Sequence, residues 1–441
     1  MPEPIQVVAV PVAAGTRGLY GWYVVGVLVI AYTLSYVDRT ILTLLVKPIR
    51  QSLAISDTQV SLLHGLAFAL FYTILGIPIA RLADSRNRVL VISAGIAVWS
   101  CMTTLCGVAR NFGQLFAARV GVGVGEAALG PAAYSLLSDY FTGPALTRAL
   151  SVYTASIYIG GGLALLIGGA VIAIVPAMYI PGVGRLEPWQ VVFLFIGTPG
   201  LAVAMLMATV REPPRAGVVA NAAAGLPVRE VAGYIRRQGT AYGLLIAGFS
   251  AFSLLWNGAS AWIPTFFQRT FMWSPAVVGL RYGLIQLVFG ILGVVSGGLL
   301  GSWLEARGRR DANPIVGIVA AAIILPAGIL APLQSDPTVS LAIFMVFVFS
   351  GSMPFGAAAS AFQQITPNQM RGQVTAVYFF FLNLAGIGLG PTVVALVTDH
   401  VFHDDLAVRY SLVVVAAIAA PLSALLLWLS LRPFRACRGI A

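Results

Sequence analysis

The sequence predicts an all-α integral membrane protein with twelve transmembrane helices in two pseudo-symmetric halves of six. Three observations indicate this fold class: a strongly apolar composition, apolar runs long enough to cross a bilayer, and a charged turn that recurs in the second half of the chain. Of the 441 residues, 59% are hydrophobic and 9% are charged, whereas a soluble domain carries about 25% charged residues. The composition excludes a water-soluble enzyme or binding module, and the long aperiodic apolar runs exclude disordered chains, fibrous chains and outer-membrane barrels.

Windows of about 20 apolar residues match the thickness of the bilayer core. The first window is too long for a signal peptide and lacks a small-residue cleavage site, so we expect it to remain as an anchor. The windows predict helices at 20–46, 57–80, 88–109, 112–139, 149–174, 189–210, 239–267, 275–303, 314–332, 339–363, 372–398 and 407–431.

These helices divide the chain into five parts. Residues 20–210 form an N-terminal six-helix half, and residues 239–431 form a C-terminal six-helix half. A linker rich in arginine, alanine and proline joins them at 211–238, and the segments 1–19 and 432–441 form the two ends. Because the number of helices is even, both ends lie on one side of the membrane.

The loops differ in charge between the two sides. Most of the 26 basic residues fall on the side of the termini, so the positive-inside rule predicts that both termini are cytoplasmic. This topology explains the formal charge of +11, since dispersed loop arginines attract anionic lipid and do not form a face for nucleic acid. The basic residues expected on the opposite side are Lys47, Arg50, Arg110, Arg185, Arg269 and Arg409.

An internal repeat links the two halves. The charged turn at 80–88, after the second helix, recurs at 301–310, after the eighth. A second pair has nearly the same offset: Pro144 with Arg148, and Pro367 with Arg371. Two equivalent halves follow from this repeat.

Six plus six helices with this repeated turn resemble the major facilitator superfamily. Gly76 and Asp84 fit its motif, whereas Ala80 and Asn87 stand where glycines are usual. The resemblance implies a transporter whose charged turns pair across the halves to hold the outward-facing state; alternatively, each arginine is only a topology signal. The gating residues that it implies are Asp84, Arg86, Arg88, Glu305, Arg309, Arg310, Arg148 and Arg371.

Four charged residues lie well inside the first and fourth predicted helices, where a charge is unfavourable and therefore marks function. Asp38 and Arg39 belong to the first helix, and Arg119 and Glu126 belong to the fourth. From a rise of about 1.5 Å per residue, Asp38 and Arg119 lie level and can pair, while Glu126 lies about 10 Å deeper than Arg119. We hypothesise that Asp38 and Arg119 contribute to an outer latch and that Glu126 carries a proton. Arg39 completes this network or meets an anionic headgroup; alternatively, the four residues only neutralise one another.

The first, fourth, seventh and tenth helices line the central cavity in the resembled family. The seventh and tenth are uncharged here, so their aromatic side chains predict an apolar wall opposite a charged one. Such a cavity suits an amphiphile, although any one aromatic can equally pack against lipid or another helix. The predicted cavity residues are Tyr36, Arg39, Arg119, Glu126, Phe252, Trp256, Asn257, Phe347, Ser350 and Met353.

Other motifs indicate no further chemistry. Gly121, Gly123 and Gly125 lie in an apolar helix with no preceding strand, which indicates close helix packing and not a nucleotide site. The three cysteines form no CxxC motif, so neither a disulfide nor a zinc site is supported. We therefore expect no cofactor and no metal, and the absence of a nucleophile–base–oxyanion constellation argues against an enzyme.

A narrower resemblance covers roughly residues 32–140. The segments Tyr36–Thr40, Lys47–Ile49, Ser56–Gln59 and Gly76–Asp84 resemble the Spinster-like branch of the superfamily, and Arg119 and Glu126 fit its fourth helix. The resemblance implies transport of lysophospholipids or sphingosine phosphate, linked to protons in several members, with roles for Asp38, Arg39, Arg119 and Glu126. Short loops favour a bacterial homologue in the inner membrane.

The sequence thus predicts a secondary transporter that rocks two halves around a midplane site. Its expected partners are membrane lipids, an amphiphilic substrate and protons, without nucleic acid, and we expect a monomer. Two alternatives remain open: an exporter of drugs or small organic anions on the same fold, and an uncoupled lipid scramblase or sensor.

Overall fold

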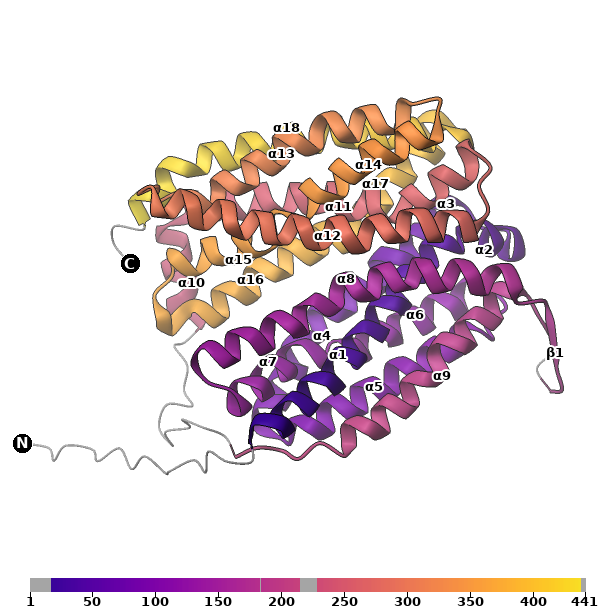
Figure 1. Cartoon of the computed structure of the whole chain (residues 1–441), viewed down its shortest axis with the longest axis horizontal. Helices are drawn as coiled ribbons and strands as arrows, with labels where there is room; N and C mark the ends of the chain where they lie inside the picture. The colour runs from indigo at the N-terminus through magenta and orange to yellow at the C-terminus, as the bar shows by residue number, and fades with distance from the viewer. Residues whose placement is uncertain (1–16, 183, 215–227, 438–441) are drawn as a thin grey trace, which may run out of the picture.

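The computed structural model describes residues 17–182, 184–214 and 228–437. Within this part, 12 helices are long and apolar enough to cross a membrane. Figure 1 shows them as two bundles lying side by side, with the earlier half of the chain below and the later half above. The predicted fold class is therefore confirmed.

The N-terminal half contains six spans and a short hairpin. Strands β1 (Met178–Ile180) and β2 (Gly184–Leu186) pair antiparallel, with Tyr179 opposite Arg185. The helices are α1 (Arg17–Ile41), η1 (Leu42–Leu44), α2 (Val46–Leu53), α3 (Asp57–Ser61), η2 (Leu62–Leu66), α4 (Ala67–Ser85), α5 (Arg88–Cys106), α6 (Phe112–Glu126), α7 (Leu129–Tyr140), α8 (Gly143–Ile174) and α9 (Pro188–Ala208).

The C-terminal half contains the other six spans. A short helix, α10 (Val228–Arg237), precedes them within the segment predicted to be a linker. The others are α11 (Gly239–Thr270), α12 (Pro275–Ala306), α13 (Ala312–Leu333), α14 (Pro337–Ser352), α15 (Pro354–Gln364), η3 (Asn368–Met370), α16 (Arg371–Asn383), η4 (Leu384–Leu389), α17 (Gly390–Leu396), η5 (Val397–Phe402), η6 (Asp405–Ala407) and α18 (Val408–Cys437).

Prolines interrupt two spans that are predicted as single helices. The fourth span breaks between α6 and α7, where Pro131 has no N–H to donate to the carbonyl of Ala127. The tenth breaks between α14 and α15, where Pro354 follows Met353. Each break lies inside a candidate membrane span.

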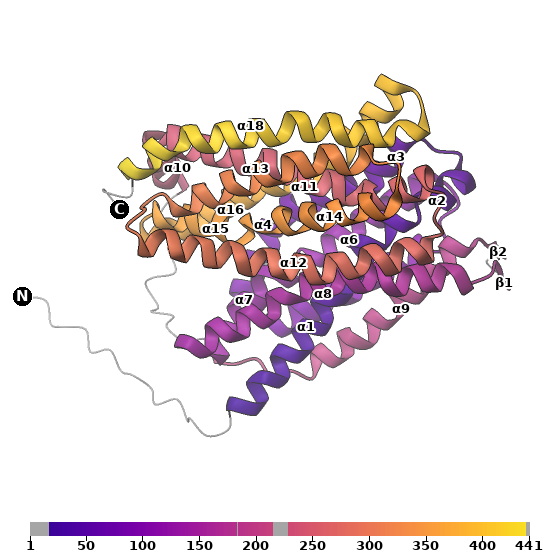
Figure 2. The same ribbon diagram turned by 45° about the horizontal axis from the view of Figure 1, so that its top comes forward.

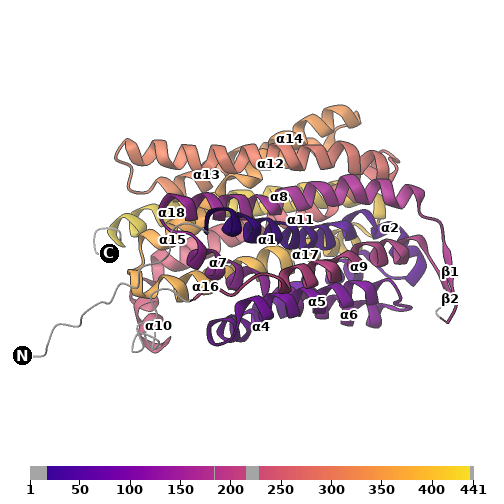
Figure 3. The same ribbon diagram turned by 60° about the horizontal axis from the view of Figure 1, so that its bottom comes forward.

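The halves contact each other along α8 and α12, which run side by side in Figures 2 and 3. Glycine permits this approach, since a Cβ on Gly279 would lie 2.1 Å from the Leu165 carbonyl oxygen. The π-helical turns η2 and η4 also meet, and a Cβ on Gly65 would lie 2.6 Å from the Gly388 carbonyl oxygen. Both contacts bring backbone of one half onto backbone of the other.

The buried core is shared at one end of the molecule and divided at the other. One apolar cluster includes residues of both halves, such as Leu44 and Phe266. Two further clusters belong to one half each: Val24 to Met207 in the N-terminal half and Tyr242 to Phe434 in the C-terminal half. Because both divided clusters include residues near the termini, which share one end in Figure 1, the halves are joined at the opposite end.

Candidate functional site

The four intramembrane charges form two separate ion pairs between α1 and α6. The guanidinium of Arg119 lies 3.3 Å from the carboxylate of Asp38, which also accepts a 3.0 Å hydrogen bond from the Thr103 hydroxyl of α5. Arg39 pairs with Glu126, donating from Nε over 2.6 Å, and the Ser35 hydroxyl donates to the same oxygen over 2.6 Å. Each carboxylate thus has one arginine and one hydroxyl as partners.

This geometry arises from helical spacing. Asp38 and Arg39 are adjacent, so their side chains diverge by about 100° and reach different partners on α6. Arg119 and Glu126 are seven residues apart and therefore share one face of α6. Asp38, Arg119 and Glu126 are fully buried, so all of these charges depend on their partners.

The Asp38–Arg119 pair does not connect the two halves. It joins α1 to α6, with Thr103 adding α5, and all three helices belong to the N-terminal half. In this conformation it therefore braces one half internally, unlike the outer latch expected from the sequence. The depth estimated from the sequence predicted that Asp38 and Arg119 lie level, but it did not predict which surface of the N-terminal half they face.

Arg39 lies among aromatic rings. Its guanidinium carbon lies 4.9 Å, 4.3 Å and 5.0 Å from the ring centroids of Tyr36, Phe68 and Tyr72. The second carboxylate oxygen of Glu126, Oε1, is buried without a hydrogen-bond partner among the described residues. The Arg39 cation is thus held against aromatic faces, and its counter-ion Glu126 has one oxygen that can still accept a hydrogen bond.

The apolar wall predicted in the C-terminal half is only partly open. Trp256 stacks on Phe347 at 5.9 Å, and Asn257 donates to the Ser253 carbonyl over 2.9 Å; both Trp256 and Asn257 are partly exposed. Four of the predicted residues are instead buried in helix packing: Phe252, Phe347, Ser350 and Met353. In the sequence, an apolar residue that lines a cavity cannot be distinguished from one that packs against a neighbouring helix.

The charged turns make contacts within their own halves. Arg88 is buried and pairs with Asp139 of α7 at 2.5 Å and with Glu212, beyond α9, at 2.6 Å. In the second copy, Arg309 pairs with Asp311 at 3.0 Å. Among the remaining turn residues, Arg371 donates to the Gln363 and Thr366 carbonyls, and Glu305 accepts from Gln364. Three arginines lie on the surface: Arg86, Arg148 and Arg310. The side chain of Asp84 lies outside the described residues.

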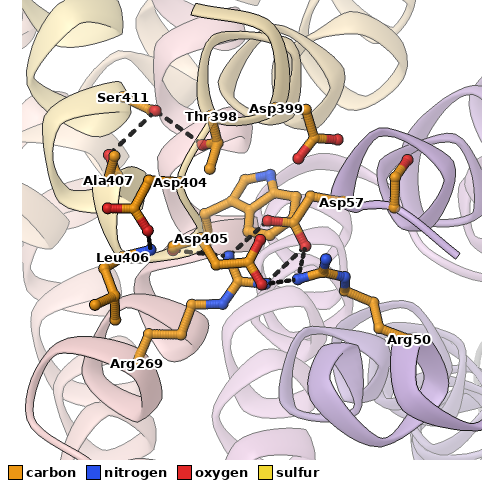
Figure 4. A network of polar contacts seen from close by, with 12 residues as sticks. Arg50, Asp57, Arg269, Thr398, Asp399, Asp404, Asp405, Leu406, Ala407 and Ser411 are labelled. Atoms are coloured by element: carbon orange, nitrogen blue, oxygen red, sulfur yellow. Dashed lines mark hydrogen bonds and ion pairs between the residues drawn. The ribbon is translucent and has the colours of Figure 1, made fainter. Parts of the chain in front are cut away.

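A different set of charges crosses between the halves, at the end opposite the termini (Figure 4). Arg269, at the end of α11, donates to both oxygens of Asp57, at the start of α3, over 2.5 Å and 2.7 Å. Arg50 of α2 contacts Asp57 at 3.1 Å and Asp405 of η6 at 2.5 Å. We call Arg50, Asp57, Arg269 and Asp405 the clasp, because this chain of ion pairs crosses the halves twice.

A pair of hydrogen bonds between the halves reinforces the clasp. Asp399 of η5 accepts hydrogen bonds from the backbone N–H and the hydroxyl of Thr58, both at 2.7 Å.

Although partial burial lowers the pKa of Arg50, its bond to Asp405 and the nearby carboxylate of Asp57 outweigh this effect, and the net pKa is raised. Arg50 is therefore firmly held in its charged form.

The clasp is not predicted from the sequence. Arg50 and Arg269 count there only as loop charges, and Asp57, Asp399 and Asp405 carry no assigned role. One signal was available: acidic residues gather at the ends of the predicted helices on the side that is poor in basic residues. Pairing across more than 200 positions, however, depends on how the halves pack.

Comparisons with known proteins place these features in context. A family model described as Major Facilitator Superfamily matches residues 28–391. An MFS-type efflux pump of Mycolicibacterium smegmatis is 28% identical over 421 residues, covering 94% of this chain and 93% of that protein. Protein spinster homolog 1 of Homo sapiens is 26% identical over 430 residues, covering 90% and 78%. Protein spinster of Drosophila melanogaster is 23% identical over 348 residues, covering 76% and 55%.

Solved structures show the same similarity. A bacterial homolog to the human lysosomal transporter Spinster, in an inward-facing and unoccupied conformation, superposes with a TM-score of 0.83 and 26% identity, covering 96% of this chain and 99% of that chain. Its inward-facing and occupied conformation gives a TM-score of 0.76 at 25% identity, covering 95% and 97%. A D-xylose–proton symporter, with a TM-score of 0.66, 15% identity and coverage of 92% and 97%, shares the fold alone.

Proposed function

Since this chain belongs to the Major Facilitator Superfamily, we propose that it carries an amphiphilic, lipid-like substrate by proton-coupled alternating access. The family and the resemblance to Spinster proteins, both predicted from the sequence, are confirmed. The chain is accordingly a membrane transporter of the Spinster type, and its family consists of transporters, not enzymes. The substrate, the coupling ion and the orientation are the proposal.

We place both termini in the cytoplasm of a bacterial inner membrane, because most basic residues lie on their side. With this orientation, the clasp closes the outer face and the divided core opens towards the cytoplasm. The similarity to an inward-facing structure, with a TM-score of 0.83, supports this assignment. Opening the other way requires the clasp to separate, because its partners lie on opposite halves.

The Arg39–Glu126 pair is the observation that carries the proposal. A buried carboxylate with one unpartnered oxygen can take a proton, and protonation removes the charge that Arg39 neutralises. Arg39 is then available to pair with an acidic group of the substrate. Proton binding at Glu126 and substrate binding at Arg39 are thereby linked through one ion pair, so each changes the affinity for the other.

The different chemistry of the two halves supports an amphiphilic substrate. The N-terminal half supplies the charges and the aromatic rings around Arg39, whereas Trp256 and Asn257 of α11, the partly exposed residues predicted for the opposite wall, are uncharged. A lysophospholipid or sphingosine-phosphate type of molecule has the matching phosphate and alkyl chain. The resemblance to the Spinster-like branch supports the same class.

Export of a drug or small organic anion is the second candidate. It is favoured by the 28% identical relative named an MFS-type efflux pump, which aligns over 94% of this chain. Transport that is independent of the length of the substrate's alkyl chain would favour this candidate. Equal movement in both directions without dependence on pH would instead favour an uncoupled scramblase or sensor.

The test is uptake of a labelled lysophospholipid into proteoliposomes, with and without an imposed pH gradient. We expect uptake driven by the gradient in the wild type and no response to the gradient in Glu126→Gln. Glu230→Gln makes the same substitution on an exposed face of α10 and is the matched control. A full response to the gradient in Glu126→Gln would exclude the proton role, and the absence of lysophospholipid uptake in the wild type would exclude the substrate class.

A further inference from the structure

A pocket of about 490 Å³ opens on the face opposite the termini, between the two halves and beside the clasp. Its walls come from α2 and the residues that follow it, from the end of α11 and from η6. It is separate from the charges of α1 and α6, none of which line it. The polar residues of its wall are Lys47, Arg50, Gln51, Gln268, Arg269 and Asp405.

Hydrogen-bond donors dominate this wall. Lys47 is exposed and has no ion-pair partner within the described part of the chain, and Arg50 and Arg269 add two guanidinium groups. The Gln268 amide nitrogen, Nε2, is buried without a hydrogen-bond partner among the described residues. A buried donor without a partner is unfavourable, so an acceptor that reaches it gains free energy.

The charges behind the wall are already partnered. Asp57 is held by Arg269 through two bonds, and Asp399 accepts from Thr58. Asp405 is the single carboxylate in the wall, and about half of its side chain remains exposed. Because Arg50 and Arg269 are neutralised by Asp57 and Asp405, Lys47 is the wall cation without an ion-pair partner in the described part of the chain, and together with the Gln268 donor it favours an anionic ligand.

The rim is apolar and strained. Ala54 and Met272 line the pocket from opposite halves, and both adopt the left-handed conformation, with φ of 52° and 55°. Met272 and Leu406 expose 77% and 57% of their surface beside the cations. Left-handed non-glycine residues are uncommon and gather at ligand sites, and exposed apolar residues beside cations suit a molecule with an acidic head and an alkyl chain.

We propose that this pocket binds the phosphate or carboxylate head of an anionic amphiphile, at a site distinct from the midplane pair. The head takes the place of Asp405 at Arg50 and accepts from Lys47 and Gln268. Because Lys47 and Arg50 belong to one half and Gln268 to the other, the bound head takes over from the Arg50–Asp405 ion pair as a link between the halves. The inference rests on this pocket and holds whether or not Glu126 carries a proton.

The first test is binding of radiolabelled octyl phosphate to the full-length protein in a neutral detergent. Removing one charge-assisted bond and one amide donor in Lys47→Gln/Gln268→Leu should weaken binding by about tenfold or more. Arg185→Gln removes one charge from the hairpin on the same face and should bind as the wild type does. Because Arg39 is itself proposed to bind the acidic group of the substrate, the comparison is made in the Arg39→Gln background, in which the midplane site is removed and the pocket should still bind.

Several outcomes would overturn the proposal. Wild-type affinity in Lys47→Gln/Gln268→Leu would exclude the pocket, and loss of binding in Arg39→Gln alone would move the ligand to the midplane. Inorganic phosphate that competes as well as unlabelled octyl phosphate would exclude the amphiphile and leave a phosphate site. Octyl glucoside that competes equally would exclude recognition of the charge.

A distance measurement tests the effect on the clasp. Spin labels at Ser52 and Ser335, exposed positions on opposite halves of the same face, report separation of the halves once Cys101, Cys106 and Cys437 are replaced. We expect Asp405→Asn to lengthen this distance without ligand and octyl phosphate to shorten it again in that variant, with no such effect once Lys47→Gln/Gln268→Leu is added. A distance in Asp405→Asn that stays long when octyl phosphate is bound would refute this link between the halves.

Discussion

The molecule uses arginine–carboxylate pairs in two regions that differ in what they join. The pairs of α1 and α6 connect helices of a single half and are buried, with Asp38 and Glu126 fully covered. The clasp connects the two halves, and its carboxylates differ in burial, since Asp57 is fully buried whereas Asp405 remains half exposed. When the halves rock, the first region moves as one body, whereas the second must break. Movement can therefore control the clasp, whereas the intramembrane pairs need not break when the halves rock.

Removing one partner of the buried pair should have the largest effect. Arg119→Met leaves the Asp38 carboxylate buried with Thr103 alone, so we expect a loss of about 3–5 kcal/mol in the free energy of unfolding. Unfolding by SDS in mixed micelles measures this loss. The double variant Asp38→Leu/Arg119→Met should recover most of it, and a double variant as unstable as the single one would contradict the pairing.

Breaking the clasp should change the conformation. Asp57→Asn removes the charge to which both Arg50 and Arg269 bind, which weakens the closed state by about 1.5–3 kcal/mol. We expect a longer Ser52–Ser335 distance and a loss of unfolding free energy that does not exceed this amount. Asp336→Asn is the control, since that carboxylate only caps α14 on the same face. An unchanged distance in Asp57→Asn would mean that packing alone joins the halves.

The seam between α8 and α12 tests the contribution of packing. A methyl group at Gly279 would meet the Leu165 carbonyl, so Gly279→Ala should weaken the closed state by about 1–3 kcal/mol and lengthen the same distance. Gly298→Ala places the methyl on the same helix where no atom lies within 4 Å, and it should have no effect. Equal effects of the two substitutions would argue against a close seam.

Removing a partner of an exposed ion pair should have the smallest effect. Arg185 and Glu187 lie 3.6 Å apart on the hairpin, with 74% and 43% of their side chains exposed. Water and salt screen such a pair, so Arg185→Gln should change the unfolding free energy by less than about 0.5 kcal/mol. A larger loss in the same SDS assay would show that burial does not rank these ion pairs.

The candidate site was predictable where the signal was local. A charge inside an apolar helix is visible in one dimension, so the order of residues alone was enough to select Asp38, Arg39, Arg119 and Glu126. Their partners were harder to predict. Arg39 pairs with Glu126, and the hydroxyls of Ser35 and Thr103 complete the two pairs, because the rotation of α1 against α6 decides which side chains meet.

The sequence by itself determined the number of helices and the two-half plan, because apolar length and a repeated turn are properties of the chain in order. Only the tertiary structure decided which charges join the halves. Asp57 meets Arg269, and Arg50 meets Asp405, across more than 200 positions, while Phe347 and Ser350 turn out to be buried. Such contacts depend on how two separate helical units dock, and docking leaves no periodic trace in the sequence of either unit.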